Sequence, residues 1–297
     1  MKSIGIFIII LLVLVIPSAT AQEMSIGEKA NQKSIIVTIN ETGEIHVIHI
    51  VSSSTSPKQV ELIDGEIKNL TITNEKNEEQ LFTTIGENQA VLIFPSDNDS
   101  IIEYDLENVL FLKDNLWTLE FLYLESITFI VPEKLDVIYV NDKVVYLDDK
   151  KGFTCHGCHM ILEYAFNEPT NIIDVNWENK EFVVEIRTFA NIENFEFNQS
   201  EKEISFDVNE SNQFITTIIP LELLWGPYAI LLDDETTYFN DSKNNGTHVW
   251  INMKPNTAGE ISIIGTTVVP EFPIIAPLVI GFLMIMMIPL IKKINLR

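Results

Sequence analysis

The chain has 297 residues and a net charge of −24, with 43 acidic against 19 basic side chains. Such an acidic excess excludes a nucleic-acid-binding protein, because those proteins need basic patches to meet phosphates. The length suffices for about two domains. A solubilising acidic exterior is the simplest explanation of the charge. Net charge by itself says nothing about the fold.

The N-terminal residues have the pattern of an export signal. Lys2 precedes an uninterrupted apolar run at residues 4–16, and Ala19 and Ala21 supply the small side chains of a signal-peptidase site. This pattern predicts a secretory signal peptide over residues 1–21, cleaved after Ala21 by signal peptidase. An exposed N-terminal segment at residues 22–32 should follow it.

Strand patterns then fill the first half of the chain. Residues 34–39 and 44–51 flank a turn around Gly43, which predicts a hairpin. Runs rich in β-branched and aromatic residues predict further strands at 67–73, 89–94, 100–105, 109–112, 116–123, 125–131, 136–140 and 143–147. The last two should turn at residues 141–142. Together they predict a β-rich N-terminal domain at 33–167.

Two features in this region suggest metal binding at first sight. His46 and His49 lie three positions apart, so they should point to opposite faces of a strand and cannot share an ion. Residues 97–100, with the sequence DNDS, carry alternating oxygens but lack the glycine and distal glutamate of a calcium loop. We therefore expect two ordinary strand histidines and a solvated turn.

The chemically unusual stretch is FTCHGCHM at residues 153–160, which holds both cysteines. Cys155, Cys158 and His159 fit the C-x-x-C-H attachment pattern of a c-type haem. A second interpretation is a Cys155–Cys158 disulfide or a structural turn, which an exported protein permits. A third is a redox thiol pair or a copper or zinc ion held by both thiolates with His156 or His159.

The surroundings of that motif favour the disulfide or structural turn, although all three interpretations stay open. The flanking residues have strand character, whereas haem attachment usually follows a helix. Met160 adjoins the histidine that would face the iron, so it cannot reach the opposite side as a sixth ligand. For a bound metal ion, a fourth ligand would have to come from elsewhere, and His248 is one candidate.

After a polar linker at 167–171, the alternation of apolar and polar residues becomes cleaner. Strands are predicted at 172–176, 181–189, 193–197, 203–208, 213–219, 228–232, 248–254 and 260–265, with one helical turn at 220–226. This number and spacing predict an immunoglobulin-like β-sandwich at 168–266, without an inter-sheet disulfide. The predicted fold class is therefore mostly β, with two β-sandwich-like domains plus a C-terminal transmembrane helix.

The C-terminal region predicts a membrane anchor. Residues 272–291 are apolar and uncharged, and they are long enough to span a bilayer as a helix. The cations in residues 292–297 should keep that tail on the cytoplasmic side. The expected protein is single-pass and membrane-anchored at the cell surface, with its N-terminal part outside.

Seven N-x-[ST] sequons fall between the two apolar ends, and a subset of them is expected to carry glycans. Because a glycan is bulky and hydrated, a used sequon must lie on an exposed loop or strand face. The candidate acceptors are Asn40, Asn69, Asn98, Asn198, Asn209, Asn240 and Asn245.

One resemblance becomes specific near the C-terminus. The stretch TTVVPEFPIIAPLVIGFLMIMMIPLIKK contains Pro270, Glu271 and Phe272 within residues 267–273, followed by an apolar helix and a basic end. It resembles the sorting signal of archaeal PEFG-CTERM surface proteins, although Pro273 stands where glycine is usual. The preceding segments VNWENKEFVVEI, FNQSEKEISFDV and GPYAILLDD extend the resemblance to about 170–297. The resemblance implies export, glycosylation and attachment at the cell surface, with an archaeosortase cleaving near the motif and transferring the chain to a lipid.

Catalytic motifs are missing from the sequence. It has no G-x-x-x-x-G-K-[ST], G-x-G-x-x-G, G-x-S-x-G or H-E-x-x-H pattern. The expected function is a glycosylated surface protein with a structural or binding role and no catalysis, whose partners are other surface proteins or glycans. The alternatives are an extracytoplasmic redox, metal-binding or haem-binding protein built on the C-x-x-C-H motif and a secreted hydrolase that uses carboxylates.

Overall fold

The computed structural model describes residues 27–148, 150–177 and 179–266, and all the regular elements in these ranges are β-strands. The prediction of a mostly β protein is confirmed. No helix among these residues has the length and hydropathy required to cross a membrane. The predicted signal peptide, the sorting motif Pro270–Phe272, the membrane helix at 272–291 and the basic tail lie outside the described residues.

The chain divides into two compact units, each made of several separate stretches of sequence. The first contains the described parts of Met1–Leu110, Glu120–Pro132 and Lys150–His159. The second contains the described parts of Phe111–Leu119, Glu133–Asp149 and Met160–Arg297. The chain therefore passes from one unit to the other several times before it reaches residue 160.

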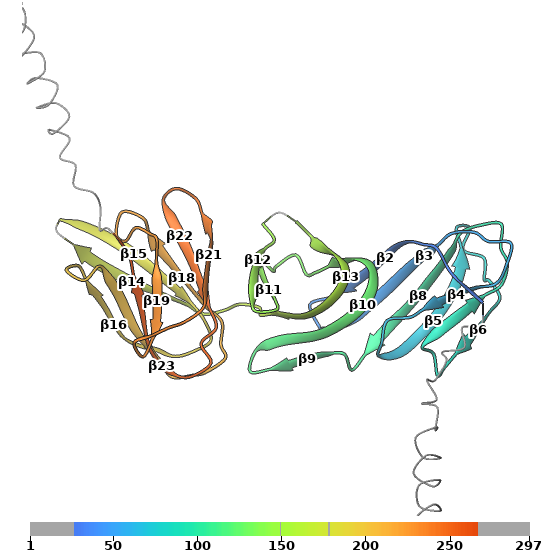
Figure 1. Ribbon diagram of the computed structural model, residues 1–297, viewed down its shortest axis with the longest axis horizontal. Helices are drawn as coiled ribbons and strands as arrows, with labels where there is room; N and C mark the ends of the chain where they lie inside the picture. Colours follow the sequence, from blue (N-terminus) through green and yellow to red (C-terminus); the bar gives the residue numbers. More distant parts are fainter. Residues whose placement is uncertain (1–26, 149, 178, 267–297) are drawn as a thin grey trace, which may run out of the picture. The chain divides into compact units, whose positions relative to one another are not determined.

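Two sheets occupy the first half of the sequence (Figure 1). The four-stranded sheet has the order β1 (Glu28–Lys29), β4 (Lys58–Glu61), β7 (Ala90–Ile93) and β6 (Phe82–Ile85). The nine-stranded sheet runs β12 (Lys143–Tyr146), β11 (Val137–Val140), β13 (Gly152–Tyr164), β10 (Leu116–Ile130), β2 (Gln32–Ile39), β3 (Ile45–Val51), β8 (Ser100–Glu107) and β5 (Glu66–Asn74), and β9 (Leu110–Lys113) pairs with β10.

The predicted hairpin at the start of the chain is confirmed and shows why these residues form strands. Every second side chain of β3 is buried, while the residues between them are half-buried. The turn between β2 and β3 is held by Asn40, whose Oδ1 accepts hydrogen bonds from the backbone N–H groups of Thr42 (3.0 Å) and Glu44 (2.8 Å). Gly43 has φ +84°, a conformation that costs glycine little.

Several strands differ from the sequence expectation. The two strands predicted at 116–123 and 125–131 are one continuous strand, β10. The polar strands β4 and β6, together with β21 (Phe239–Asn244), have no predicted counterpart. Their sequences, KQVE, FTTI and FNDSKN, lack sustained apolar alternation. The strands β6 and β21 lie at sheet edges and expose polar side chains, whereas β4 lies inside its sheet but has only four residues.

Two five-stranded antiparallel sheets share a single core in the second unit (Figure 1). One sheet runs β14 (Thr170–Trp177), β15 (Lys180–Arg187), β18 (Ile215–Pro220), β22 (His248–Met253) and β21. The other runs β16 (Ile192–Asn198), β17 (Glu203–Val208), β23 (Gly259–Ile264), β19 (Ala229–Leu232) and β20 (Glu235–Thr236). Their inward side chains include Val184 and Ile251 from the first sheet and Phe206 and Ile263 from the second.

The β11–β12 hairpin belongs to the second unit, together with the two five-stranded sheets. The ring of Tyr139 stacks on that of Phe214, and Asn252 Nδ2 donates a hydrogen bond of 2.7 Å to Tyr146 Oη. Lys254 Nζ lies 2.8 Å from a carboxylate oxygen of Glu163 on β13, and both side chains are largely buried. These aromatic and ionic contacts attach the hairpin to the sheets.

Candidate functional site

Both cysteines lie within strand β13 and are joined by a disulfide. Their Cα atoms are 5.7 Å apart, a common separation for bridged cysteines. In a regular strand, residues three positions apart would be separated by about 10 Å. The backbone must therefore fold back locally, and Gly157 between them, with φ +65°, allows it to do so.

The disulfide has one accessible and one inaccessible end. Cys155 is half-buried, whereas Cys158 is only 2% exposed and is followed by His159 on the surface. His156 is also exposed, and its Nδ1 forms a hydrogen bond with Ser126 Oγ on β10. A reagent in solution can therefore approach the pair from the Cys155 side.

The other residues named as candidate ligands lie in different surroundings. Within the described ranges, no three or more His, Cys, Asp or Glu side chains are grouped as metal ligands. The other candidate ligand, His248, begins β22, where its Nδ1 lies 2.9 Å from Thr247 Oγ1.

The two strand histidines point to opposite faces of β3, as their spacing predicts. His46 is half-buried, and its Nδ1 lies 2.8 Å from Asp105 Oδ1. His49 is completely buried, and burial lowers its pKa to about 4. The buried histidine is thus held neutral at physiological pH.

A continuous hydrogen-bond chain fixes the tautomer of His49. The backbone N–H of Ile63 donates to Tyr104 Oη (2.9 Å), so the Tyr104 hydroxyl is available to donate to His49 Nε2 (2.9 Å). The other ring nitrogen, Nδ1, then carries the proton and donates to Gln32 Oε1 (2.6 Å). Gln32 Nε2 donates onward to Tyr123 Oη. A neutral imidazole satisfies every group in this chain.

The second unit contains a polar groove that the sequence did not suggest. It has a volume of about 680 Å³, and its charged lining includes Glu168, Arg187, Lys243 and Asp148. Burial raises the pKa of Glu168 to about 7, against the opposing effect of the Arg187 charge. Lys243 Nζ lies 3.2 Å from Asp148 Oδ1. Glu168 is one of 43 acidic residues, so no sequence signal distinguishes it.

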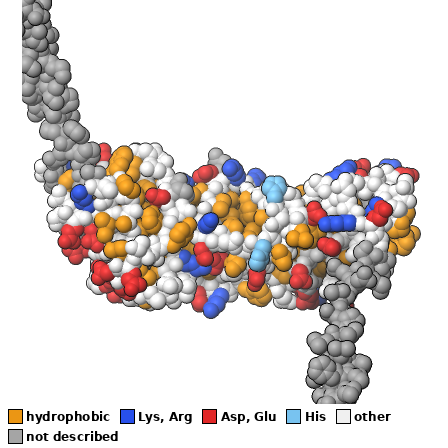
Figure 2. Space-filling view, in the orientation of Figure 1, with side chains coloured by type: hydrophobic (Ala, Val, Ile, Leu, Met, Phe, Trp, Pro, Cys, Tyr) orange, Lys and Arg blue, Asp and Glu red, His pale blue; other side chains and the backbone are white. Residues whose placement is uncertain are grey.

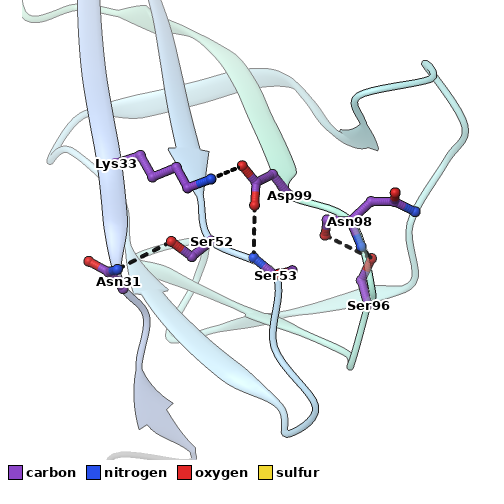
Figure 3. A network of polar contacts seen from close by, with 7 residues as sticks. All are labelled: Asn31, Lys33, Ser52, Ser53, Ser96, Asn98 and Asp99. Carbon is purple, nitrogen blue, oxygen red and sulfur yellow. Dashed lines mark hydrogen bonds and ion pairs between the residues drawn. The ribbon is translucent and has the colours of Figure 1, made fainter.

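The DNDS turn is a polar surface network (Figure 3). Asp99 forms an ion pair with Lys33 on β2, and its other carboxylate oxygen accepts a hydrogen bond from the backbone N–H of Ser53 (3.0 Å). Asn98 belongs to one of the sequons, and Figure 3 shows its side chain pointing away from the labelled neighbours. The Asp99 carboxylate thus ties this turn to β2 and to the segment after β3.

All seven sequon asparagines are exposed or half-buried. Three of them donate hydrogen bonds through Nδ2 to nearby carboxylates: Asn40 to Glu44, Asn69 to Asp105 and Asn198 to Glu201. Asn98, Asn209 and Asn245 have no such bond to a described residue, and Asn240 lies within the edge strand β21. The acidic side chains are likewise spread over the visible face, as Figure 2 shows.

Comparisons with known proteins do not assign a family. No protein-family model and no curated protein matches the chain. Among solved structures, an aminopeptidase N family protein from Idiomarina loihiensis is similar with a TM-score of 0.34 and 8% sequence identity. The similarity covers 50% of this chain and 32% of that chain. A likeness at this level carries no argument about activity.

Proposed function

We propose that this chain is an exported, glycosylated protein of a cell surface, with a structural or binding role and no catalysis. The proposal includes two β-sandwich-like domains, the second of immunoglobulin-like size, outside the membrane. The helix at 272–291 anchors them, and the motif Pro270–Phe272 is the signal for an archaeosortase. Other surface proteins or glycans are the expected partners.

The observation that carries this proposal is the Cys155–Cys158 disulfide. A disulfide persists outside the reducing cytosol, which agrees with the export signal in the sequence. The surface positions of the sequon asparagines and the acidic exterior support the same location, because glycans need exposed acceptors and surface proteins need a soluble exterior.

The test is the intact mass of the full-length chain purified without reductant from the membranes of cells that produce it. The proposal expects loss of residues 1–21, added glycan mass, and a mass about 2 Da below that of the dithiol form, the two hydrogens lost when a disulfide forms. If the chain were instead recovered from the cytosolic fraction of the same cells, unmodified and with an intact N-terminus, export and surface attachment would both be overturned.

A second candidate is an extracytoplasmic redox, metal-binding or haem-binding protein centred on the same motif. The exposure of His156 and His159 beside the half-buried Cys155 favours it, because these groups are accessible to a ligand or a reductant. If the thiols were free, Cys155, Cys158 and His159 would hold a haem or, with His156, a copper or zinc ion. Elemental analysis and a visible absorption spectrum of the same sample would detect either group.

A further inference from the structure

The second unit carries an open apolar groove beside the loop that joins β21 to β22. Its volume is about 510 Å³, and its lining includes Phe182, Val183, Leu221 and Trp225. Trp225 is 50% exposed and Val183 is 43% exposed. Large apolar surfaces left in water are unfavourable, so a molecule that covers Trp225 would gain free energy.

Part of the lining of this groove comes from the residues that directly follow a sequon asparagine. Gly246, Thr247 and His248 line the groove, and Asn245 precedes them in the chain. Asn245 Oδ1 accepts hydrogen bonds from Thr247 N (3.0 Å), Thr247 Oγ1 (2.9 Å) and His248 N (2.8 Å). The side chain of Asn245 is thereby held against Thr247 and His248, two of the residues that line the groove.

The nitrogen that would carry a glycan remains available. Asn245 is exposed, and its Nδ2 makes no hydrogen bond within the part of the chain that the structure describes. In contrast, Nδ2 of Asn69 donates to Asp105 at 2.7 Å, and that of Asn198 donates to Glu201 at 3.1 Å. Attachment at Asn245 therefore breaks no existing contact of its Nδ2.

We propose that Asn245 carries an N-linked glycan whose first sugars lie in this groove against Trp225. The inference rests on the proposed export of the chain. In the transfer step, Asn245 Nδ2 bonds to C1 of the sugar and loses a proton, while the bond from C1 to the phosphate of a lipid-linked donor breaks. One face of a pyranose carries mainly C–H groups, and this apolar face is complementary to an indole ring.

The first experiment maps glycopeptides from the full-length chain produced in its own cells. The peptide containing Asn245 should carry a glycan, which Thr247→Ala should abolish because the sequon is lost. The matched control Thr247→Ser retains the sequon and should retain the glycan. An unmodified Asn245 on a chain glycosylated at other sequons would overturn this inference and leave export intact. A chain retaining residues 1–21 and lacking glycans would instead indicate failure of export.

The second experiment tests contact between the glycan and the groove through acrylamide quenching of tryptophan fluorescence. The fluorescence of the Thr247→Ala chain should be quenched more strongly than that of the Thr247→Ser chain, because without the glycan Trp225 is exposed to acrylamide. This difference should disappear when both changes are made in a Trp225→Phe background. Equal quenching of the two glycosylation variants, with the glycan present only on Thr247→Ser, would refute packing against Trp225.

Discussion

The buried His49 should make the first unit sensitive to mild acid. Its pKa is about 4 in the folded chain and 6.5 for the unperturbed side chain. Because the folded-state pKa is lowered, the stabilisation is fully present above pH 6.5 and is lost as the pH falls towards 4. A difference of about 2.5 pKa units corresponds to about 3 kcal/mol of unfolding free energy.

The structural reason is the hydrogen-bond chain around the ring. Protonated His49 would carry a second N–H facing Tyr104 Oη, so the Tyr104 hydroxyl would lose its acceptor within the chain. No carboxylate is hydrogen-bonded to the His49 ring among the described residues, so the buried positive charge would have no counterion there. The hydrogen bond from Lys33 lowers the pKa of Asp99. Protonation of this carboxylate therefore changes the free energy of unfolding mainly below this pH range.

The assay is the free energy of unfolding in urea at intervals between pH 7.5 and pH 4. His49→Gln should cost about 1–2 kcal/mol at pH 7, because Tyr104 or Gln32 loses a buried partner. Its stability should then decline less than that of the wild type as the pH falls. His46→Gln, on the opposite, half-buried face of the same strand, is the control and should keep the wild-type decline. Parallel curves for the wild type and His49→Gln would refute the assignment.

Three further outcomes follow from single features. Replacing Cys155 and Cys158 by serine should lower the free energy of unfolding by about 2 kcal/mol, since the closed loop is very short; an unchanged urea midpoint would contradict this. Burial raises the pKa of Glu168 from 4.5 to about 7, so its stabilising effect is present below pH 4.5 and is lost as the pH rises to 7. Glu168→Gln should therefore gain up to about 3 kcal/mol relative to the wild type between pH 4.5 and pH 8, and identical pH profiles would exclude this role. Gly152→Ala should cost about 3 kcal/mol in a thermal melt, because its Cβ would lie 1.8 Å from the Phe129 carbonyl oxygen; a melt like that of the wild type would show that β13 can shift.

Regular alternation made several strands with one buried face predictable, although β13, which buries Cys158 and Met160, was given no strand range. In β17, Ile204, Phe206 and Val208 alternate with polar residues, and the predicted range 203–208 agrees with the structure. A polar edge strand such as β21 gives no such signal, because no apolar face of it needs to be buried. The continuity of β10 could not be foreseen either, since Glu125 and Ser126 at its centre resemble a break between strands.

The candidate sites were harder to predict than the strands, because they depend on contacts between residues far apart in the sequence. The local spacing of Cys155 and Cys158 was sufficient to raise a disulfide as one interpretation. The burial of His49 depends on Tyr104, 55 positions away, and the raised pKa of Glu168 depends on its surroundings in a groove. Neither environment has a local sequence pattern. The apolar groove beside Asn245 likewise combines β15, the turn after β18 and the β21–β22 loop.

The attachment of the β11–β12 hairpin to the second unit limits how evolution or an engineer could exchange these domains. A gene fusion that begins at residue 168 would retain Phe214 and Lys254 but omit Tyr139, Asp142 and Glu163. In the transplanted module the Phe214 ring would lose its stacking partner, and Lys254 would lose both of its carboxylate partners. A recombination boundary placed before residue 111 would keep these contacts together, although it would also carry the segments of β10 and β13 that belong to the first unit. The linker at 167–171 is thus a poor junction for modular inheritance.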